Sequence, residues 1–157
     1  MKNILLSILV LSLALFAGCK KDDSCDPNMI IAAAPASEVE ALQQYLSNNK
    51  IEAQKDPRGF FYKIQTGGTG NHPTACSKVN VNYIGSLTNG TVFDRSNDVD
   101  LKLSLVVKGW QAGIPLIAQG GKITLYLPPS LGYGASGTGG IPGNAILIFS
   151  IDLVKVY

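Results

Sequence analysis

The sequence contains few of the residues that hold metals or carry out nucleophilic catalysis. It has one histidine and three cysteines among its 157 residues. The histidine, His72, lies in a Gly-Asn-His-Pro segment with no second ligand at a useful spacing, so we expect no metal ion, and nothing indicates a cofactor. The formal net charge is only +2. This balance does not suggest nucleic-acid binding, which depends on a clear excess of positive charge.

The apolar stretch near the N-terminus is too short to cross a membrane as a helix. It covers residues 4–16 and follows Lys2, whereas a membrane-spanning helix needs roughly 20 apolar residues. This layout is typical of a secretory signal. Ala17, Gly18 and Cys19 resemble a bacterial lipobox, in which the cysteine receives lipid and becomes the mature N-terminus. We therefore expect a lipoprotein signal peptide at residues 1–18 and lipidation of Cys19; the alternative is an ordinary signal peptide followed by a structural cysteine.

A lipid anchor on Cys19 would hold an otherwise water-exposed domain at a membrane surface. We accordingly expect the protein in the cell envelope, anchored through lipid and either facing the periplasm or exposed on the cell surface. An exported compartment permits a disulfide between Cys25 and Cys76. Two free thiols are the alternative, because a pairing cannot be read from sequence alone.

A tether and a helix precede the main domain. Residues 19–36, rich in small and polar residues, are predicted to be a tether, and residues 37–59 a helix followed by a turn. Ser37 and Glu40 form a predicted capping box, and Val39, Leu42 and Leu46 fall on one helical face. We expect this face to pack on the domain; the alternative is a dimerisation helix.

From residue 60 onward apolar residues alternate with polar ones, which indicates an antiparallel sheet. Asn89-Gly90 predicts a hairpin turn. The helical candidate in this half, residues 108–118, contains Pro115, which limits its regular length. We expect an α+β domain over residues 60–157, with the sheet packed on this short helix. The predicted strands are residues 60–65, 78–84, 101–105, 123–127 and 145–156.

Five sequence landmarks occur in one order in this domain. They are Tyr83-Ile84-Gly85, Phe93-Asp94, Val106-Val107-Lys108-Gly109-Trp110, Tyr133-Gly134, and Ile141-Pro142 followed by Phe149. Together they resemble the FKBP-type peptidyl-prolyl isomerases, whose active site is an aromatic box built around a proline ring. The resemblance covers roughly residues 60–157 and implies a curved antiparallel sheet wrapped on one short helix.

The resemblance also implies a role for each matching residue. Asp94 would lie near the carbonyl of the twisting bond, and the hydroxyl of Tyr133 and the backbone N–H of Ile141 would donate to substrate carbonyls. Leu101 stands where the family usually has an aromatic residue, and the loop that normally precedes Val106 is missing. The remaining residues would form the floor and walls of the prolyl slot: Trp110 as floor, with Tyr83, Phe93, Val106, Val107 and Phe149 as walls. For each of them, packing in the core is the alternative.

The resemblance implies an enzyme that assists the folding of exported proteins by favouring a twisted prolyl amide. Its partners would be proline-containing segments of those proteins, together with the membrane that holds the lipid anchor. A non-catalytic peptide-binding or chaperone lipoprotein that uses the same pocket is the alternative, because a fold does not guarantee its function. A structural surface lipoprotein is a third class.

Overall fold

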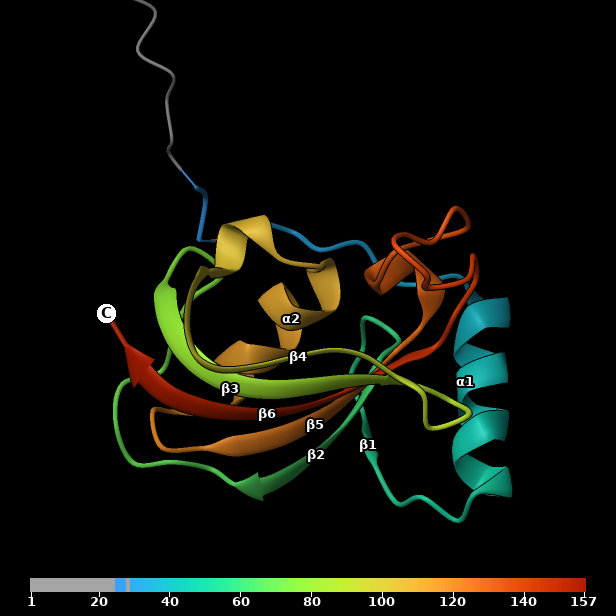
Figure 1. Cartoon of the computed structure of the whole chain (residues 1–157), viewed down its shortest axis with the longest axis horizontal. Coiled ribbons are helices and arrows are strands. Elements are labelled where there is room, and N and C mark those ends of the chain that lie inside the picture. The colour runs from blue at the N-terminus through green and yellow to red at the C-terminus, as the bar shows by residue number, and fades with distance from the viewer. Residues whose placement is uncertain (1–24, 28) are drawn as a thin grey trace, which may run out of the picture.

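The computed structural model describes residues 25–157 except residue 28 (Figure 1). The predicted signal peptide at residues 1–18 and the predicted lipidation site, Cys19, lie outside the described residues. Within the described part, no helix is both long enough and apolar enough to cross a membrane.

A six-stranded sheet with the order β1-β2-β5-β6-β3-β4 forms the body of the domain, and all neighbouring strands are antiparallel. Figure 1 shows this sheet curving around the short helix α2, Lys108–Gly113. The predicted fold class is therefore confirmed. The strands are β1 (Gln54–Lys55), β2 (Phe61–Thr66), β3 (Lys78–Leu87), β4 (Val92–Lys102), β5 (Lys122–Leu127) and β6 (Leu147–Val156).

The alternating pattern correctly predicted which face of the sheet is buried. Val79 and Val81 of β3, and Ile151 and Leu153 of β6, are at most 1% exposed. They join the residues of α2 in one apolar core. Burying one face of an antiparallel sheet requires this period of two, because successive side chains point to opposite faces.

Helix α2 ends earlier than the predicted residue 118. It stops at Gly113 and continues as a 3-10 turn, Ile114–Leu116, that contains Pro115. Two glycines let this helix lie directly on β5: a Cβ on Gly113 would come within 2.6 Å of Leu125, and one on Gly109 would overlap Leu127. The close approach of α2 to the sheet therefore depends on the missing side chains.

The predicted strand at residues 101–105 is wrong beyond Lys102. The chain forms a 3-10 turn at Leu103–Leu105, in which Leu103 is fully buried while Leu105 is 81% exposed. The N–H of Val106 donates to the carbonyl of Leu103 at 3.3 Å and closes this turn. Alternating leucines look like a strand face, but three residues per turn direct Leu105 away from the core.

Strand β4 starts nine residues before the predicted strand. Its residues from Asp94 to Asp100 are mostly polar and exposed, so no alternation of apolar residues marks them. A hairpin joins it to β3 as predicted, with the N–H of Leu87 donating to the carbonyl of Thr91 at 2.9 Å. In the predicted turn, Gly90 has a φ of +85°, whereas the φ of Asn89 is negative. The side-chain oxygen of Asn89, Oδ1, accepts a hydrogen bond from the N–H of Thr91.

Helix α1 spans Ala36–Asn48 and packs on the domain, as expected. Val39, Leu42 and Leu46 are buried in a second apolar cluster with Phe61 and Tyr126. The predicted capping box of Ser37 and Glu40 is wrong, because the N-cap is Pro35, two residues before Ser37, and no side chain forms a capping bond. Ser37 is already inside the first turn, where it cannot cap.

The described part of the predicted tether lies against the domain. Cys25 and Cys76 are joined by a disulfide. Ile31 and Ala34 pack on the main core, and the N–H of Ala34 donates to the carbonyl of Arg58 at 2.9 Å. Of the two alternatives open from the sequence, the structure has the paired cysteines, and residues 25–35 are held at both ends.

Candidate active site

Four aromatic rings from four elements stack edge to face beside α2. Trp110 of α2 contacts Tyr83 of β3, with ring centroids 5.0 Å apart, and Phe149 of β6, at 5.2 Å. Phe93 of β4 in turn contacts Phe149 at 5.6 Å. These arrangements are favourable because the positive edge of one ring meets the negative face of the next.

Gly85 is the reason that Phe93 and Phe149 can meet. A Cβ at this position would lie 2.7 Å from the Phe93 ring and 2.9 Å from the Phe149 ring. Packing thus requires a glycine at this position of the Tyr83-Ile84-Gly85 landmark. Without a side chain there, Phe93 can contact Phe149, whose ring packs against Trp110.

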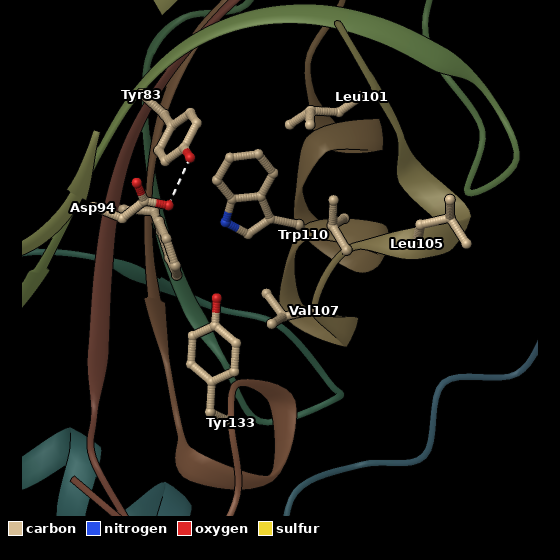
Figure 2. A pocket seen from close by; sticks show the side chains of 9 residues that line it. Tyr83, Asp94, Leu101, Leu105, Val107, Trp110 and Tyr133 are labelled. Atoms are coloured by element: carbon tan, nitrogen blue, oxygen red, sulfur yellow. Dashed lines mark hydrogen bonds between the residues drawn. The ribbon is translucent and has the colours of Figure 1, made fainter. Parts of the chain in front are cut away.

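A cavity of about 230 Å³ opens over these rings (Figure 2). Trp110 is 3% exposed and forms its floor. Apolar side chains make most of the wall, and oxygen atoms lie at one side, where Tyr83, Asp94 and Tyr133 face each other (Figure 2). The lining residues are Tyr83, Asp94, Leu101, Leu105, Val106, Val107, Trp110, Tyr133 and Phe149.

Asp94 lies at the rim of the cavity. The Tyr83 hydroxyl donates to Asp94 Oδ2 at 2.6 Å, as Figure 2 shows. The residue is exposed, so its charge remains in contact with solvent. Water and the Tyr83 hydroxyl offset the cost that full burial of this charge would carry. The bond also fixes the direction in which the carboxylate faces the cavity.

Both tyrosines of the site stay protonated at neutral pH. Burial, followed by the hydrogen bond to Asp94, raises the pKa of Tyr83 far above its usual value. Burial and the nearby charge of Asp94 also raise the pKa of Tyr133. A protonated phenol can donate a hydrogen bond. Figure 2 shows the Tyr133 hydroxyl directed into the cavity, where it can reach a carbonyl of a bound peptide.

The indole nitrogen of Trp110 is a further donor on the cavity floor. Its Nε1 is buried and has no hydrogen-bond partner among the described residues. A buried unpaired donor is costly to a folded protein. The sequence predicted Trp110 as the floor of the prolyl slot but not the free indole N–H, because the orientation of an indole ring is set by the surrounding tertiary structure.

The structure brings together most, but not all, of the predicted site residues. Phe93 supports Phe149 from behind and does not line the cavity. Ile141 is 8% exposed in the core, and its N–H donates to the carbonyl of Thr138 at 2.6 Å. A substrate could use that N–H only if this turn opened. The predicted role of Ile141 as a donor therefore stays a prediction.

Leu105 is the lining residue that the sequence did not reveal. It falls within the predicted strand at residues 101–105, yet it is exposed at the cavity edge. The only sequence signal was the shortened segment before Val106, which left the shape of this edge open.

The site is suited to holding an apolar ring and orienting nearby carbonyl groups. Among the residues that line the cavity in the described part of the chain, none is a cysteine, serine, histidine or lysine. Of the side chains that form covalent intermediates or transfer protons, the lining thus has only one carboxylate and two tyrosines, whose raised pKa keeps them protonated. What remains is an apolar slot with phenol and indole donors.

Comparisons with known proteins agree with this geometry. A model of the FKBP-type peptidyl-prolyl cis-trans isomerase family matches residues 70–154. A probable FKBP-type peptidyl-prolyl cis-trans isomerase of Haemophilus influenzae is 35% identical over 147 residues, covering 85% of this chain and 61% of the relative. FkpA of Aeromonas hydrophila is 39% identical over 120 residues, covering 73% of this chain and 45% of the relative. The chain thus spans about half the length of these curated relatives.

Solved structures show the same fold. The crystal structure of FkpA from Escherichia coli aligns with a TM-score of 0.70 at 34% identity, covering 77% of this chain and 60% of that one. A peptidyl-prolyl cis-trans isomerase from Pseudomonas syringae aligns with a TM-score of 0.68 at 30% identity, covering 80% of this chain and 98% of that one. With its curved sheet, its aromatic cavity over Trp110 and these matches, the chain belongs to the FKBP-type peptidyl-prolyl cis-trans isomerase family.

Proposed function

We propose that this protein catalyses the cis-trans isomerisation of peptide bonds that precede proline. The observation that carries the proposal is the apolar cavity floored by Trp110, which is edged by hydrogen-bond donors and contains no usual nucleophile. The uncatalysed reaction is slow because amide resonance opposes rotation by about 18 to 20 kcal/mol. Catalysis therefore requires a site that favours the twisted amide over the planar one.

The cavity supplies that preference in two ways. Twisting an amide reduces its polarity, so an apolar, water-poor slot disfavours the planar ground state more than the twisted transition state. The floor and walls receive the proline ring, while the Tyr133 hydroxyl orients a substrate carbonyl. Asp94, held by Tyr83 at 2.6 Å, places a negative charge beside the carbonyl carbon of the rotating bond.

The test is an isomerisation assay on residues 20–157 with a peptide carrying an apolar residue before proline. Tyr133→Phe and Asp94→Ala should lower the rate by about ten- to a hundredfold, the value of one hydrogen bond or charge contact made in the transition state. Trp110→Leu should weaken peptide binding as well. Tyr62→Phe, which changes a tyrosine of β2 outside the cavity, is the matched control.

Two results would contradict the enzyme proposal. One is wild-type protein indistinguishable from buffer in the assay, with circular dichroism confirming its fold. The other is equal loss in Tyr133→Phe and the Tyr62→Phe control. Peptide binding without catalysis would leave the non-catalytic peptide-binding or chaperone module.

We further propose that the protein acts in the cell envelope, anchored through lipid on Cys19, on proline-containing segments of exported proteins. The apolar stretch at residues 4–16 and the Ala17-Gly18-Cys19 sequence support this location. The disulfide between Cys25 and Cys76 supports an oxidising compartment. Cys19→Ala should release the protein from the membrane fraction without unfolding it. A variant that remained fully membrane-bound would contradict the anchor.

A further inference from the structure

One polar contact joins the N-terminal helix to the segment that carries Tyr133. The backbone N–H of Ser130 donates to Glu38 Oε2 at 2.8 Å, across 92 residues of sequence. Glu38 lies in the first turn of α1, and Ser130 lies in the 3-10 turn Pro129–Leu131. Figure 1 shows that this turn and the loop beyond it lie next to one end of α1.

Glu38 is held in place by the packing of its helix. Val39, which follows it, is 9% exposed, and Leu42, one turn further on, is fully buried against the domain. A helix seated by such contacts cannot rotate freely about its axis. The Glu38 carboxylate is therefore presented to Ser130 by a rigid element.

The 3-10 turn Pro129–Leu131 directly precedes the loop that carries Tyr133 and is hydrogen-bonded to it. The N–H groups of Gly132 and Gly134, which flank Tyr133, both donate to the carbonyl of Pro129, at 2.9 and 2.8 Å. Leu131 is 1% exposed in the main core. The direction of the Tyr133 side chain thus depends on how this single turn is placed.

In the part of the chain that the structure describes, the side chain of Ser130 forms no hydrogen bond that would hold the turn. Ser130 Oγ is buried and has no hydrogen-bond partner among the described residues. Ser130 is therefore joined to α1 by its backbone N–H, which donates to a charged acceptor. Hydrogen bonds to charged groups are stronger than neutral ones.

We propose that Glu38 is a positioning residue for Tyr133. Helix α1 lies outside the family match at residues 70–154, yet it braces the turn from which the Tyr133 hydroxyl enters the cavity. Loss of the Glu38 carboxylate should loosen this turn and leave the phenol less often in its productive orientation. The effect on catalysis rests on the proposed function, whereas the effect on the turn does not.

The first test measures the turn without using activity. Backbone amide exchange, followed by NMR, should be at least about tenfold faster at Ser130 and Gly134 in Glu38→Ala than in the wild-type protein. Leu42 in α1 should be unaffected, which excludes unfolding of the helix. Glu40→Ala, which removes an exposed carboxylate from the same helix, is the matched control. Unchanged exchange at Ser130 and Gly134 would overturn the proposal.

The second test links the contact to Tyr133. Glu38→Ala should lower kcat by about three- to tenfold with little change in KM, and Glu38→Gln, which keeps an acceptor oxygen, should recover part of the loss. In the Tyr133→Phe background, Glu38→Ala should cost nothing further. Losses that add fully in the double variant would overturn the proposal. An inactive wild-type protein would instead contradict the proposed function, and the exchange comparison would still decide the role of Glu38.

Discussion

At the scale of single residues, the site depends on how its polar atoms are held. Asp94 is exposed at the rim, and one short bond from Tyr83 orients it toward the cavity. Tyr83 also contacts the edge of Trp110, so one side chain serves both the floor and the rim. Its ring and its hydroxyl can be tested separately, because phenylalanine keeps the first and removes the second.

We expect Tyr83→Phe to lower the isomerisation rate by about tenfold while peptide binding changes little. The substitution removes the bond to Asp94, and a hydrogen bond to a charged group is worth about 1.5 to 3 kcal/mol. The ring contact with Trp110 at 5.0 Å should persist. Rate and affinity would be measured side by side with the Tyr62→Phe control. An affinity loss as large as the rate loss would show that the hydroxyl matters for the shape of the cavity.

At the scale of elements, the helix that carries Trp110 is placed by its contact with β5. Gly109 and Gly113 face Leu127 and Leu125 so closely that neither position has room for a Cβ. Residues four apart lie on the same helical face, so the two glycines make one smooth surface. The depth of the cavity floor therefore depends on two residues that have no side chain.

We expect Gly109→Ala to destabilise the domain by about 1 to 3 kcal/mol, because it overfills a packed contact. The direction of the change in stability is informative, because replacing glycine by alanine in an unconstrained helix stabilises it by about 1 kcal/mol. Gly67→Ala is the control, since a Cβ there meets nothing within 4 Å. Urea unfolding would compare the two variants. A Gly109→Ala protein more stable than wild type would refute the close contact.

The outer edge of the sheet is joined by charges as well as by strand pairing. Lys78 of β3 lies 2.7 Å from Asp100 of β4, and the Tyr157 hydroxyl donates to the same carboxylate at 3.0 Å. The hydrogen bond from Lys78, followed by that from Asn80, lowers the pKa of Asp100 from 3.8 to about 2. The charged form of Asp100 thus supports the folded edge.

This pKa shift predicts a loss of stability in acid. The contribution of Asp100 should be fully present above pH 3.8, the ordinary pKa, and should be lost as the pH falls through about 2. The urea midpoint of the wild-type protein should therefore fall between pH 4 and pH 2. Asp100→Asn, which has no carboxylate to protonate, should show a smaller fall. Equal falls in both proteins would exclude a role for this group.

At the scale of the whole molecule, the N-terminal segment is tied to the domain at three places. The disulfide holds Cys25 to Cys76, Ala34 bonds to Arg58, and α1 covers Phe61 and Tyr126. A segment expected to be a tether is thus part of the folded unit from residue 25, apart from residue 28, which is not described. If Cys19 carries lipid, five residues separate the anchor from the disulfide, and the bond limits how far the domain can move from the membrane.

We expect the double variant Cys25→Ala, Cys76→Ala to lose at most about 4 kcal/mol of stability. The bond spans 51 residues, and a chain-entropy model of that loop length sets this upper figure. Guanidinium unfolding would be measured with and without a thiol reductant. The reductant should lower the stability of the wild-type protein and leave the double variant unchanged. Two alkylatable thiols in protein taken from its native envelope would contradict the pairing.

The sequence by itself determined the fold class, the period of two in most of the recognised strands and the membership of most of the site. Val79, Val81 and Ile151 were predictable because a period of two is enforced locally, by the pleat of each strand and the burial of one face. The landmarks around Trp110, Tyr133 and Phe149 could be recognised because their residue types and order appear directly in the chain.

Tertiary structure alone decided the features that join distant segments. Leu105 is exposed because the chain turns where a strand was predicted, Asp94 lies at the rim of the cavity, and Cys25 is bonded to Cys76. The contact of Glu38 with Ser130 joins positions 92 residues apart. The local periodicity of a sequence indicates whether a residue faces the core. It does not indicate which distant atom that residue contacts, since such contacts depend on the path of the whole backbone.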